Sequence, residues 1–416
     1  MLALLCEVEE ERPAIAAAKV VLPCVQMLED GTPTARVAAS DALMNLALSL
    51  ESRVKFMKEL EYSYDVLIKA IADAPVREGR TRSNCATVLQ AFCATTSGEE
   101  GLEARVAIGK GGGIEACTQL LIDGPDKARV PASGLLQYLA QVEELKSRFM
   151  TAGAVKPLLA VAERVTVDMW GRAYAVGALR WLSMSHEIMR PNLMHETPES
   201  KGKSAAVDED IDADEPPSPI TPVSLDQLSP SIRFRTLQLA PMETVQGEAL
   251  EDLNRRKKEL IEADCVKAMC RLLMPQRDAD GNPVAKPAGK KKKAAPREPD
   301  LETAHTNATG VLRHLMLDPV GMQQVLDMNA VNNVMPLLES PSTQLRSNAH
   351  AMLSLMTLER PHVMALKRAG APEYYTNLLD GVTPKKPSTP EVNPMAAFLI
   401  DDPEALAKVI ERATMK

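Results

Sequence analysis

The sequence predicts an all-α protein made of repeated helical units, and three observations lead to this prediction. The chain has 416 residues, of which 45% are hydrophobic but only 3% aromatic, so its core consists of Ala, Val, Leu, Ile and Met. Ala, Leu, Met, Glu and Lys are strong helix formers, whereas sheets favour aromatic and β-branched residues. The third observation is that short apolar segments recur along the chain at a spacing typical of helical repeat proteins.

One recurring segment is predicted to begin a helix, and several copies carry a proline in the first turn. Proline is tolerated there because the first N–H groups of a helix have no intrahelical partner. The copies are residues 21–25, 114–118, 155–159, 266–270 and 334–338.

A second recurring segment follows each copy of the first and predicts another helix. Its copies are residues 42–46, 88–92, 135–139, 178–182, 311–315 and, more weakly, 352–356. Taking the fourth residue of each copy as a register mark gives steps of 46, 47, 43, 133 and 41 residues. All steps except the fourth therefore agree with one repeat length.

A third, shorter helix precedes the other two in each unit. Its clearest copies are residues 54–58, 145–150, 321–326 and 362–366. Small residues follow it, including Gly153 and Gly370, which allow the positive φ or the close backbone approach of a helix–helix corner. Three helices in about 41 to 47 residues are typical of the armadillo and HEAT class of repeats.

Within that class, two stretches resemble the armadillo repeat: Gly-Ala-Val-Lys-Pro-Leu-Leu at 153–159 and Gly-Ala-Leu-Arg-Trp-Leu at 177–182. The resemblance extends over roughly residues 14–190 and 248–380. It implies an all-α, right-handed armadillo-type α-solenoid of about six to seven three-helix repeats, with two polar inserts. Because this fold has many unrelated roles, the resemblance alone does not identify a partner.

The long step divides the chain into four parts. Residues 1–191 form an N-terminal block of repeats, 192–247 an acidic Pro-rich insert, 248–380 a C-terminal block and 381–416 a tail with a short terminal helix. The insert and a Lys-rich loop at 275–300 are too polar and Pro-rich to order by themselves. Proline follows Ser218, Thr221 and Ser229 in the insert, as proline-directed phosphorylation requires.

No segment predicts catalysis, a metal or a cofactor. The glycine-rich stretch Gly109–Gly113 is not a phosphate-binding loop, because it follows no strand and occupies the register of a helix corner. The histidines lack H-E-x-x-H spacing, and the seven cysteines include no C-x-x-C pair. Cys24 and Cys117 fall at apolar positions of the repeat, so we expect inert core thiols. An enzyme would need a further domain, so the protein is predicted to be non-enzymatic, without a small-molecule substrate.

The net charge and the hydropathy of the sequence limit the possible classes of partner and the cellular location. The formal charge of −8 does not favour specific nucleic-acid binding, and no apolar run reaches the length of a membrane span. Residues 1–7 lack the basic region of a signal peptide. We therefore expect a cytoplasmic protein that binds other proteins.

The resemblance implies that the third helix of each repeat lines a concave groove, where an Asn ladder holds extended ligands. Asn45 matches this ladder, but the other register marks do not, which argues against capture of basic peptides in the manner of import receptors. Positions at the marks and seven residues earlier predict a polar and aromatic patch instead. The candidate partner-binding residues are Asn45, Asn84, Tyr138, Tyr174, Trp181, Asn307, His314 and Asn348. The alternative is that Tyr138 and Trp181 pack between repeats as core.

Two basic features have further interpretations. An arginine lies nine residues before most marks, at Arg36, Arg82, Arg129, Arg172 and Arg346. Nine residues reach the opposite side of a helix, so we expect this row to bind carbonyl groups between repeats. The run Lys290–Lys293 is either a solvated loop or a patch for acidic partners, such as the tails of tubulin.

The sequence therefore predicts a scaffold or adaptor that docks partner proteins in a multi-subunit assembly. Armadillo proteins without an enzyme domain include docking proteins of ciliary axonemes and cytoskeletal assemblies, and this subgroup is favoured here. The alternative is a chaperone or cargo adaptor that grips a client peptide or helix in the groove.

Overall fold

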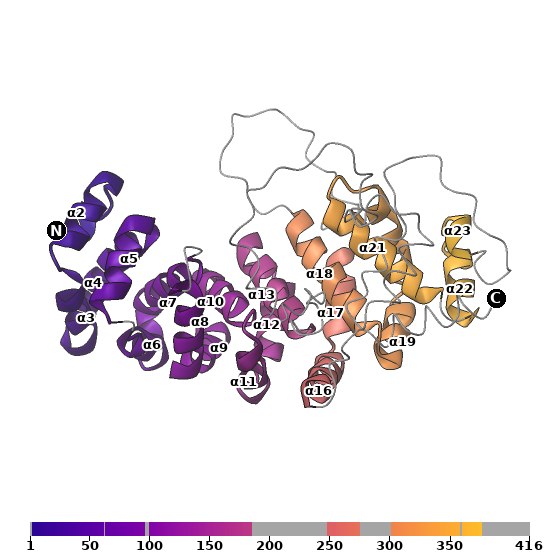
Figure 1. The fold of residues 1–416 in the computed structure, drawn as a ribbon, viewed down its shortest axis with the longest axis horizontal. Helices are drawn as coiled ribbons and strands as arrows, with labels where there is room; N and C mark the ends of the chain where they lie inside the picture. The colour runs from indigo at the N-terminus through magenta and orange to yellow at the C-terminus, as the bar shows by residue number, and fades with distance from the viewer. Residues whose placement is uncertain are drawn as a thin grey trace, which may run out of the picture.

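The computed structural model describes residues 2–61, 63–95, 100–184, 248–274, 301–357 and 360–376. Across these residues every regular element is a helix, as predicted. The helices stack into an elongated array that runs from the N-terminal to the C-terminal side (Figure 1). The predicted armadillo-type α-solenoid is thereby confirmed.

Six three-helix repeats can be followed through the described residues. Their first helices are α2 (Arg12–Ala17), α5 (Leu50–Glu59), α8 (Glu100–Ile108), α11 (Lys146–Thr151), α16 (Glu248–Glu262) and α19 (Pro319–Asp327). Their second helices are α3 (Val21–Asp30), α6 (Asp65–Ala72), α9 (Ile114–Asp123), α12 (Val155–Glu163), α17 (Cys265–Leu273) and α20 (Val331–Val334). Their third helices are α4 (Pro33–Leu48), α7 (Gly79–Cys93), α10 (Asp126–Leu139), α13 (Met169–Leu182), α18 (Leu301–Leu315) and α21 (Thr343–Met356).

Shorter pieces complete the array. Helix α1 (Leu2–Leu5) precedes the first repeat, and α22 (Arg360–Arg368) and α23 (Glu373–Thr376) follow the sixth. The recurring segment at 334–338 departs from its prediction, since α20 ends at Val334 and a 3-10 turn, Met335–Glu339, replaces the rest of the helix.

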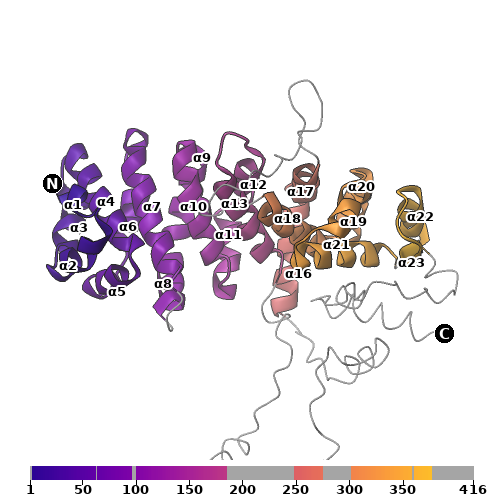
Figure 2. The same cartoon turned by 90° about the horizontal axis from the view of Figure 1, so that it is seen from above.

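Third helices of successive repeats pack against one another, and so do the second helices. Figure 2 shows the second helices α9, α12, α17 and α20 along one edge of the array and the first helices α8 and α16 along the other. Helix α16 packs on α11, α17 and α18, so it is the first helix of the fifth repeat. The break in periodicity therefore falls after the fourth repeat, between α13 and α16.

Several predictions lie outside the described residues. These are the insert at 192–247 with its three phosphorylation candidates, the lysines Lys290, Lys291, Lys292 and Lys293, and the short terminal helix. They remain predictions.

The corner between the first and second helix has the same backbone geometry in each repeat. Gly112, Gly153 and Gly370 have positive φ there, as expected for glycine. Four equivalent corners use a residue with a side chain at φ values between 50° and 63°: Lys19, Glu61, Asp264 and Asn329. The stretch Gly109–Gly113 is such a corner, kinked at Gly112 between α8 and α9, which confirms the interpretation made from its register.

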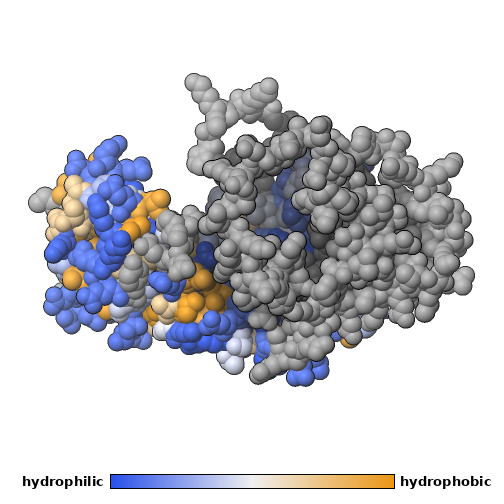
Figure 3. All heavy atoms as spheres, viewed as in Figure 1, coloured by the Kyte–Doolittle hydropathy of each residue, from blue (hydrophilic) through white to orange (hydrophobic). Residues whose placement is uncertain are grey.

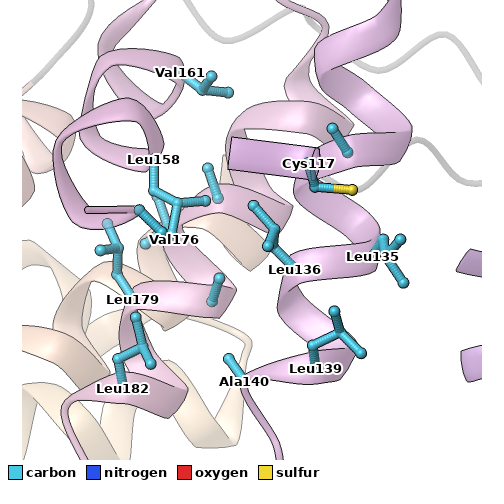
Figure 4. Packing of buried hydrophobic residues seen from close by; sticks show 14 of the residues in the cluster. Cys117, Leu135, Leu136, Leu139, Ala140, Leu158, Val161, Val176, Leu179 and Leu182 are labelled. Carbon is cyan, nitrogen blue, oxygen red and sulfur yellow. The ribbon is translucent and has the colours of Figure 1, made fainter. Parts of the chain in front are cut away.

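Aliphatic side chains from neighbouring repeats fill the core. Leu136 and Leu139 of α10 lie close to Leu158 of α12 and Leu179 of α13 (Figure 4), and all four are fully buried. Burying one such side chain contributes about 1.5–3 kcal/mol to folding. The aromatic shortage of the sequence is therefore consistent with the packing.

The cysteines belong to this core. All seven are buried and unpaired by disulfides. Burial raises the pKa of Cys24 to about 11 and that of Cys117 to about 12, so neither thiol ionises near neutral pH. The expectation of inert core thiols is met at both positions.

Arginines of the third helices cap the second helices. Each donates a hydrogen bond from the side chain to a carbonyl at the C-terminal end of the second helix in its own repeat. The pairs are Arg82 to Ile71, Arg129 to Leu121, Arg172 to Ala162 and Arg346 to Ser340. The row was expected to bind carbonyls between repeats, which is wrong for these four. Arg36 and Arg82 do cross to the next repeat, where their partners are the carboxylates of Glu78 at 2.6 Å and Asp123 at 2.8 Å.

The surface over the N-terminal repeats is mainly hydrophilic, with separate apolar spots (Figure 3). No helix among the described residues has the length and apolar character needed to cross a membrane.

Candidate functional site

A groove with a volume of about 1330 Å³ lies along the third helices of the second, third and fourth repeats. We call it the central groove. Its walls come from α7, α10 and α13, from the loop before α13 and from the end of α17. Residues that line it include Gln90, Asp126, Lys127, Pro131, Glu163, Thr166, Asp168, Trp170, Tyr174 and Arg271.

Trp170 is the aromatic side chain that the groove exposes most. Asp168 caps the start of α13 by accepting a hydrogen bond from the Trp170 backbone N–H at 2.8 Å. The ring of Trp170 lies 5.7 Å from that of Tyr174, centroid to centroid, and its side chain remains 38% exposed. A large ring that is held in place yet exposed is typical of an interface anchor.

Tyr174 connects Trp170 to the deeper part of the groove. Burial raises the pKa of its hydroxyl, the nearby Tyr138 raises it further, and a hydrogen bond from the Gln90 side chain partly opposes both. Gln90 belongs to α7 and Tyr174 to α13, so this contact spans three consecutive third helices.

Glycines in the third helices make room for this spanning contact. A Cβ atom added at Gly134 of α10 would lie 2.2 Å from the Gln90 amide nitrogen, which is too close for any side chain. The same relation recurs in the next repeats. The pairs are Gln90 over Gly134, Gln137 over Gly177 and Arg180 over Gly310. We call the three long side chains the polar ladder.

The polar ladder has hydrogen-bonding capacity that the described residues do not use. The side-chain oxygen of Gln137 is buried and accepts no hydrogen bond within the described ranges. Buried acceptors are usually satisfied, so an unsatisfied one requires an explanation. Arg180 continues the ladder toward the fifth repeat and donates to the side-chain oxygen of Asn307 at 3.2 Å.

Three predicted groove residues are asparagines that the structure buries between third helices. Asn84 donates to Asp41 at 2.7 Å, Asn307 donates to the Ala173 carbonyl at 3.4 Å, and Asn348 donates to the Thr306 carbonyl at 3.0 Å. Their exposed fractions are 6%, 9% and 0%. Each side chain therefore links its repeat to the preceding one, and none presents an open surface to a partner.

His314, also predicted for the groove, is buried on α18. Burial lowers its pKa well below the ordinary value, and the cations Arg313, Lys257, Arg180 and Lys146 lower it further. It therefore lies in a region of positive potential between the fourth and fifth repeats, and it is neutral at physiological pH.

The remaining predicted residues are accessible in part. Asn45, Tyr138 and Trp181 are half-buried. The Arg105 guanidinium lies 5.3 Å from the centre of the Tyr138 ring, and both Tyr138 and Trp181 pack against the core. Packing against the core therefore holds for both rings, neither ring lines the central groove, and binding by these residues stays a prediction.

The candidate residues predicted for the groove omitted Trp170 and the polar ladder, although the sequence places both tryptophans, Trp170 and Trp181, on the third helix of one repeat. The glycines Gly134, Gly177 and Gly310 recur four residues before the register mark, and each interrupts a helix at a cost of about 0.5–1 kcal/mol relative to Ala. That recurrence was the available signal. It indicates that something must cross the helix at this point.

Metal chemistry has no support among the described residues, which contain no group of three or more His, Cys, Asp or Glu side chains arranged to hold an ion.

Designed and engineered proteins of known structure are similar to this chain. No protein-family model and no curated protein matches the chain. A computationally designed armadillo repeat protein for modular peptide recognition is 15% identical and covers 80% of this chain and 97% of its own, with a TM-score of 0.49. A designed armadillo repeat protein in complex with the peptide (KR)4 is 13% identical and covers 82% and 99%, with a TM-score of 0.46. An engineered protein is 14% identical and covers 84% and 98%, with a TM-score of 0.49. At these scores the fold is established by the repeats of the chain itself.

Proposed function

We propose that this protein is a non-enzymatic scaffold that docks a segment of a partner protein in the central groove. The observation that supports this most directly is the exposed Trp170 ring, which packs against Tyr174 in the lining of a large groove. Tryptophan and tyrosine are enriched at the energetic centres of protein interfaces, because they bury a large area with few rotatable bonds.

The polar ladder supports an extended segment as the bound form. Gln90 lines the central groove, and Gln137 and Arg180 continue the ladder over the next two helical glycines, outside the groove lining. Amide and guanidinium groups at regular intervals match the N–H and C=O groups of an extended chain, which need partners when water is excluded. The helical stability lost at these glycines is then offset by recognition of the partner main chain.

In its finer form, the proposal is a docking component of a multi-subunit assembly, such as a ciliary axoneme or another cytoskeletal structure in the cytoplasm. Acidic tails such as those of tubulin are one partner class, through Lys290–Lys293. The second candidate is a chaperone or cargo adaptor that grips a client in the same groove. A scaffold would co-purify with its partner at fixed stoichiometry, whereas a chaperone would bind transiently and suppress aggregation of its client.

The test compares wild type with a Gly134→Ala/Gly177→Ala variant. Both new methyl groups meet the flexible ends of Gln90 and Gln137, so they displace the ladder without meeting rigid backbone. We expect the unfolding free energy to stay unchanged or to rise by about 1 kcal/mol, since Ala is the better helix former. Affinity for the partner, identified by mass spectrometry after purification from native cells and then measured with purified proteins, should fall at least tenfold.

Trp170→Ala should have a comparable effect on affinity, with Leu22→Ala as its control, because Leu22 is an exposed apolar residue on α3 outside the groove. Unchanged partner affinity in both the Trp170 and the double glycine variants would refute docking in the central groove.

A further inference from the structure

The charges around the central groove show which kind of segment it selects. Its acidic groups are already engaged. Asp126 accepts hydrogen bonds from Thr166 and Arg129, Glu163 pairs with Arg271 at 2.7 Å, and Asp168 caps α13. Each acidic side chain of the wall therefore already has an intramolecular hydrogen-bond or ion-pair partner.

Lys127 differs from these acidic residues because it has no ion-pair partner among the described residues. Its side chain is exposed at the start of α10, and the described residues form no ion pair with it. A carboxylate reaching the groove would therefore find a cation with no competing intramolecular partner. Lys127 also occupies the same register as Trp170, eleven residues before the marks at 138 and 181, so the two lie at equivalent points of adjacent third helices.

The backbone of α10 adds a hydrogen-bond acceptor beside Lys127. Pro131 lies inside this helix and has no N–H, so the Lys127 carbonyl lacks its usual donor four residues on. Both residues line the groove. This carbonyl can instead accept a hydrogen bond from a backbone N–H of a bound segment.

The spacing of adjacent helices sets the spacing of the ligand groups. Packed helices lie about 8–10 Å apart, and residues i and i+2 of an extended chain lie on one face about 7 Å apart. With the reach of the Lys127 side chain, a carboxylate at i and an apolar side chain at i+2 can be accommodated together.

Building on the docking function above, we propose that the central groove selects an extended partner segment carrying an acidic residue two positions from an aromatic or large aliphatic residue. The carboxylate pairs with Lys127, the apolar side chain packs on Trp170, and a backbone N–H of the segment donates to the Lys127 carbonyl.

The experiment uses the full chain with Trp181→Phe, so that Trp170 is the one tryptophan and its fluorescence reports on the groove. Twelve-residue Gly/Ser peptides carrying Asp-Ser-Phe or Phe-Ser-Asp are titrated to millimolar concentration, against matched peptides with Asn or Lys in place of Asp. In one of the two sequence orders, the Asp peptide should bind at least fivefold more tightly than the matching Asn peptide, and the Lys peptide should bind most weakly. Raising the salt concentration should reduce the difference.

Three variants test which residues cause the preference for the Asp peptide. Lys127→Met should remove the preference for Asp over Asn and leave the Asn peptide unaffected, whereas Lys156→Met, which removes an exposed lysine of α12 outside the groove, should change nothing. Pro131→Ala restores the missing N–H, so it should weaken all peptides severalfold while raising the melting temperature.

Equal affinity for the Asp, Asn and Lys peptides would overturn the acidic selectivity and leave groove docking intact. An acidic preference that survives Lys127→Met would also overturn the proposal, because the selectivity would then arise elsewhere. Groove docking itself fails only if native partner binding survives Trp170→Ala and the double glycine change.

Discussion

The junctions within the N-terminal repeats and the junction across the interruption are stabilised in different ways. In the first two regular junctions, an arginine of the following first helix donates to a carbonyl at the end of the preceding third helix. Arg53 reaches Ala47 at 2.7 Å, and Arg105 reaches Cys93 at 2.8 Å. A cation at the C-terminal end of a helix is favourable because it opposes the helix dipole.

The interrupted junction uses a cluster of buried charges. Arg256 of α16 is 1% exposed and pairs with Glu143 of the fourth repeat at 2.9 Å. The same carboxylate binds Lys146, which is fully buried and donates to the Met184 carbonyl beyond the end of α13. Here the lysine of the fourth repeat caps the third helix of its own repeat, and the cap from the following repeat is replaced by an ion pair.

This difference shows what chain continuity contributes to a repeat array. Where one repeat follows directly on another, short-range arginine caps and apolar packing are combined with single ion pairs such as Arg36–Glu78. Where residues 185–247 intervene, α16 returns from far along the chain and must find one position among many similar helix surfaces. Buried charges penalise every misaligned position, so we infer that this cluster sets the register of the returning repeat.

Neutralising Glu143 should break the interrupted junction most severely. Glu143→Gln leaves Lys146 buried without its carboxylate, whereas Arg256 keeps its ion pair with Asp252, and removing one partner from a buried pair typically costs about 3–5 kcal/mol. Because one of the two cations retains a carboxylate, urea denaturation should show a loss of about 3 kcal/mol at pH 7, at the lower end of that range. Glu144→Gln, next in sequence and paired with Lys110 at the surface, is the control and should cost less than about 0.5 kcal/mol.

The pH dependence sharpens this prediction. Burial lowers the pKa of Lys146 to about 8, below the ordinary value of 10.5 for lysine. Between these values the unfolded chain holds more protons on this group, so its contribution to stability increases as the pH rises. The ion pair with Glu143 exists only while Lys146 is charged. The stability lost in Glu143→Gln should therefore become smaller between pH 7 and pH 9. A loss that does not depend on pH would show that Glu143 acts by packing alone.

Removing a regular cap should have a smaller effect. Arg105→Met deletes the hydrogen bond to the Cys93 carbonyl and the contact with the Tyr138 ring. Hydrogen bonds from charged groups contribute about 1.5–3 kcal/mol, so we expect a loss of about 2 kcal/mol in the same assay. Arg80→Met, at an exposed surface ion pair, serves as the control. A loss as large as that of Glu143→Gln would contradict the distinction between the two kinds of junction.

The smallest expected effect concerns His314. Its pKa lies well below the ordinary value of 6.5, since it is buried beside four cations. Below pH 6.5 the unfolded chain therefore binds a proton that the folded chain excludes, and stability falls as the pH decreases, by at most about 1.4 kcal/mol per pH unit. His314→Gln should flatten this slope between pH 6.5 and pH 5. An unchanged slope would assign the acid sensitivity to other groups.

The sequence predicted the fold well because repeats restate the same pattern many times. Register marks placed the third helices correctly, and the arginine row was found together with the side of the helix that it occupies. Periodicity gives the azimuth of a side chain but not the partner it meets, so it could not show that the carbonyl partner of Arg82 lies in its own repeat while its carboxylate partner, Asp123, lies in the next.

The candidate site was predicted less well for a related reason. Asn84, Asn307 and Asn348 share the azimuth of the register marks but lie nearly two turns earlier, where the adjacent third helix covers them. A single helix period cannot show this, because coverage depends on how two helices cross. Trp170 and the glycines were visible in the sequence, but their meaning requires the neighbouring repeat.

The two kinds of junction also have a consequence for the order in which the chain folds. The regular caps join residues only 6 to 12 positions apart, whereas Arg256 and Glu143 are separated by 113 positions and Arg180 and Asn307 by 127. Local contacts form quickly, while distant ones wait for a long loop to close. We therefore expect the first four repeats to fold as a unit as soon as they are synthesised. The fifth and sixth repeats would dock afterwards, in a slower phase that depends on the length of the intervening chain.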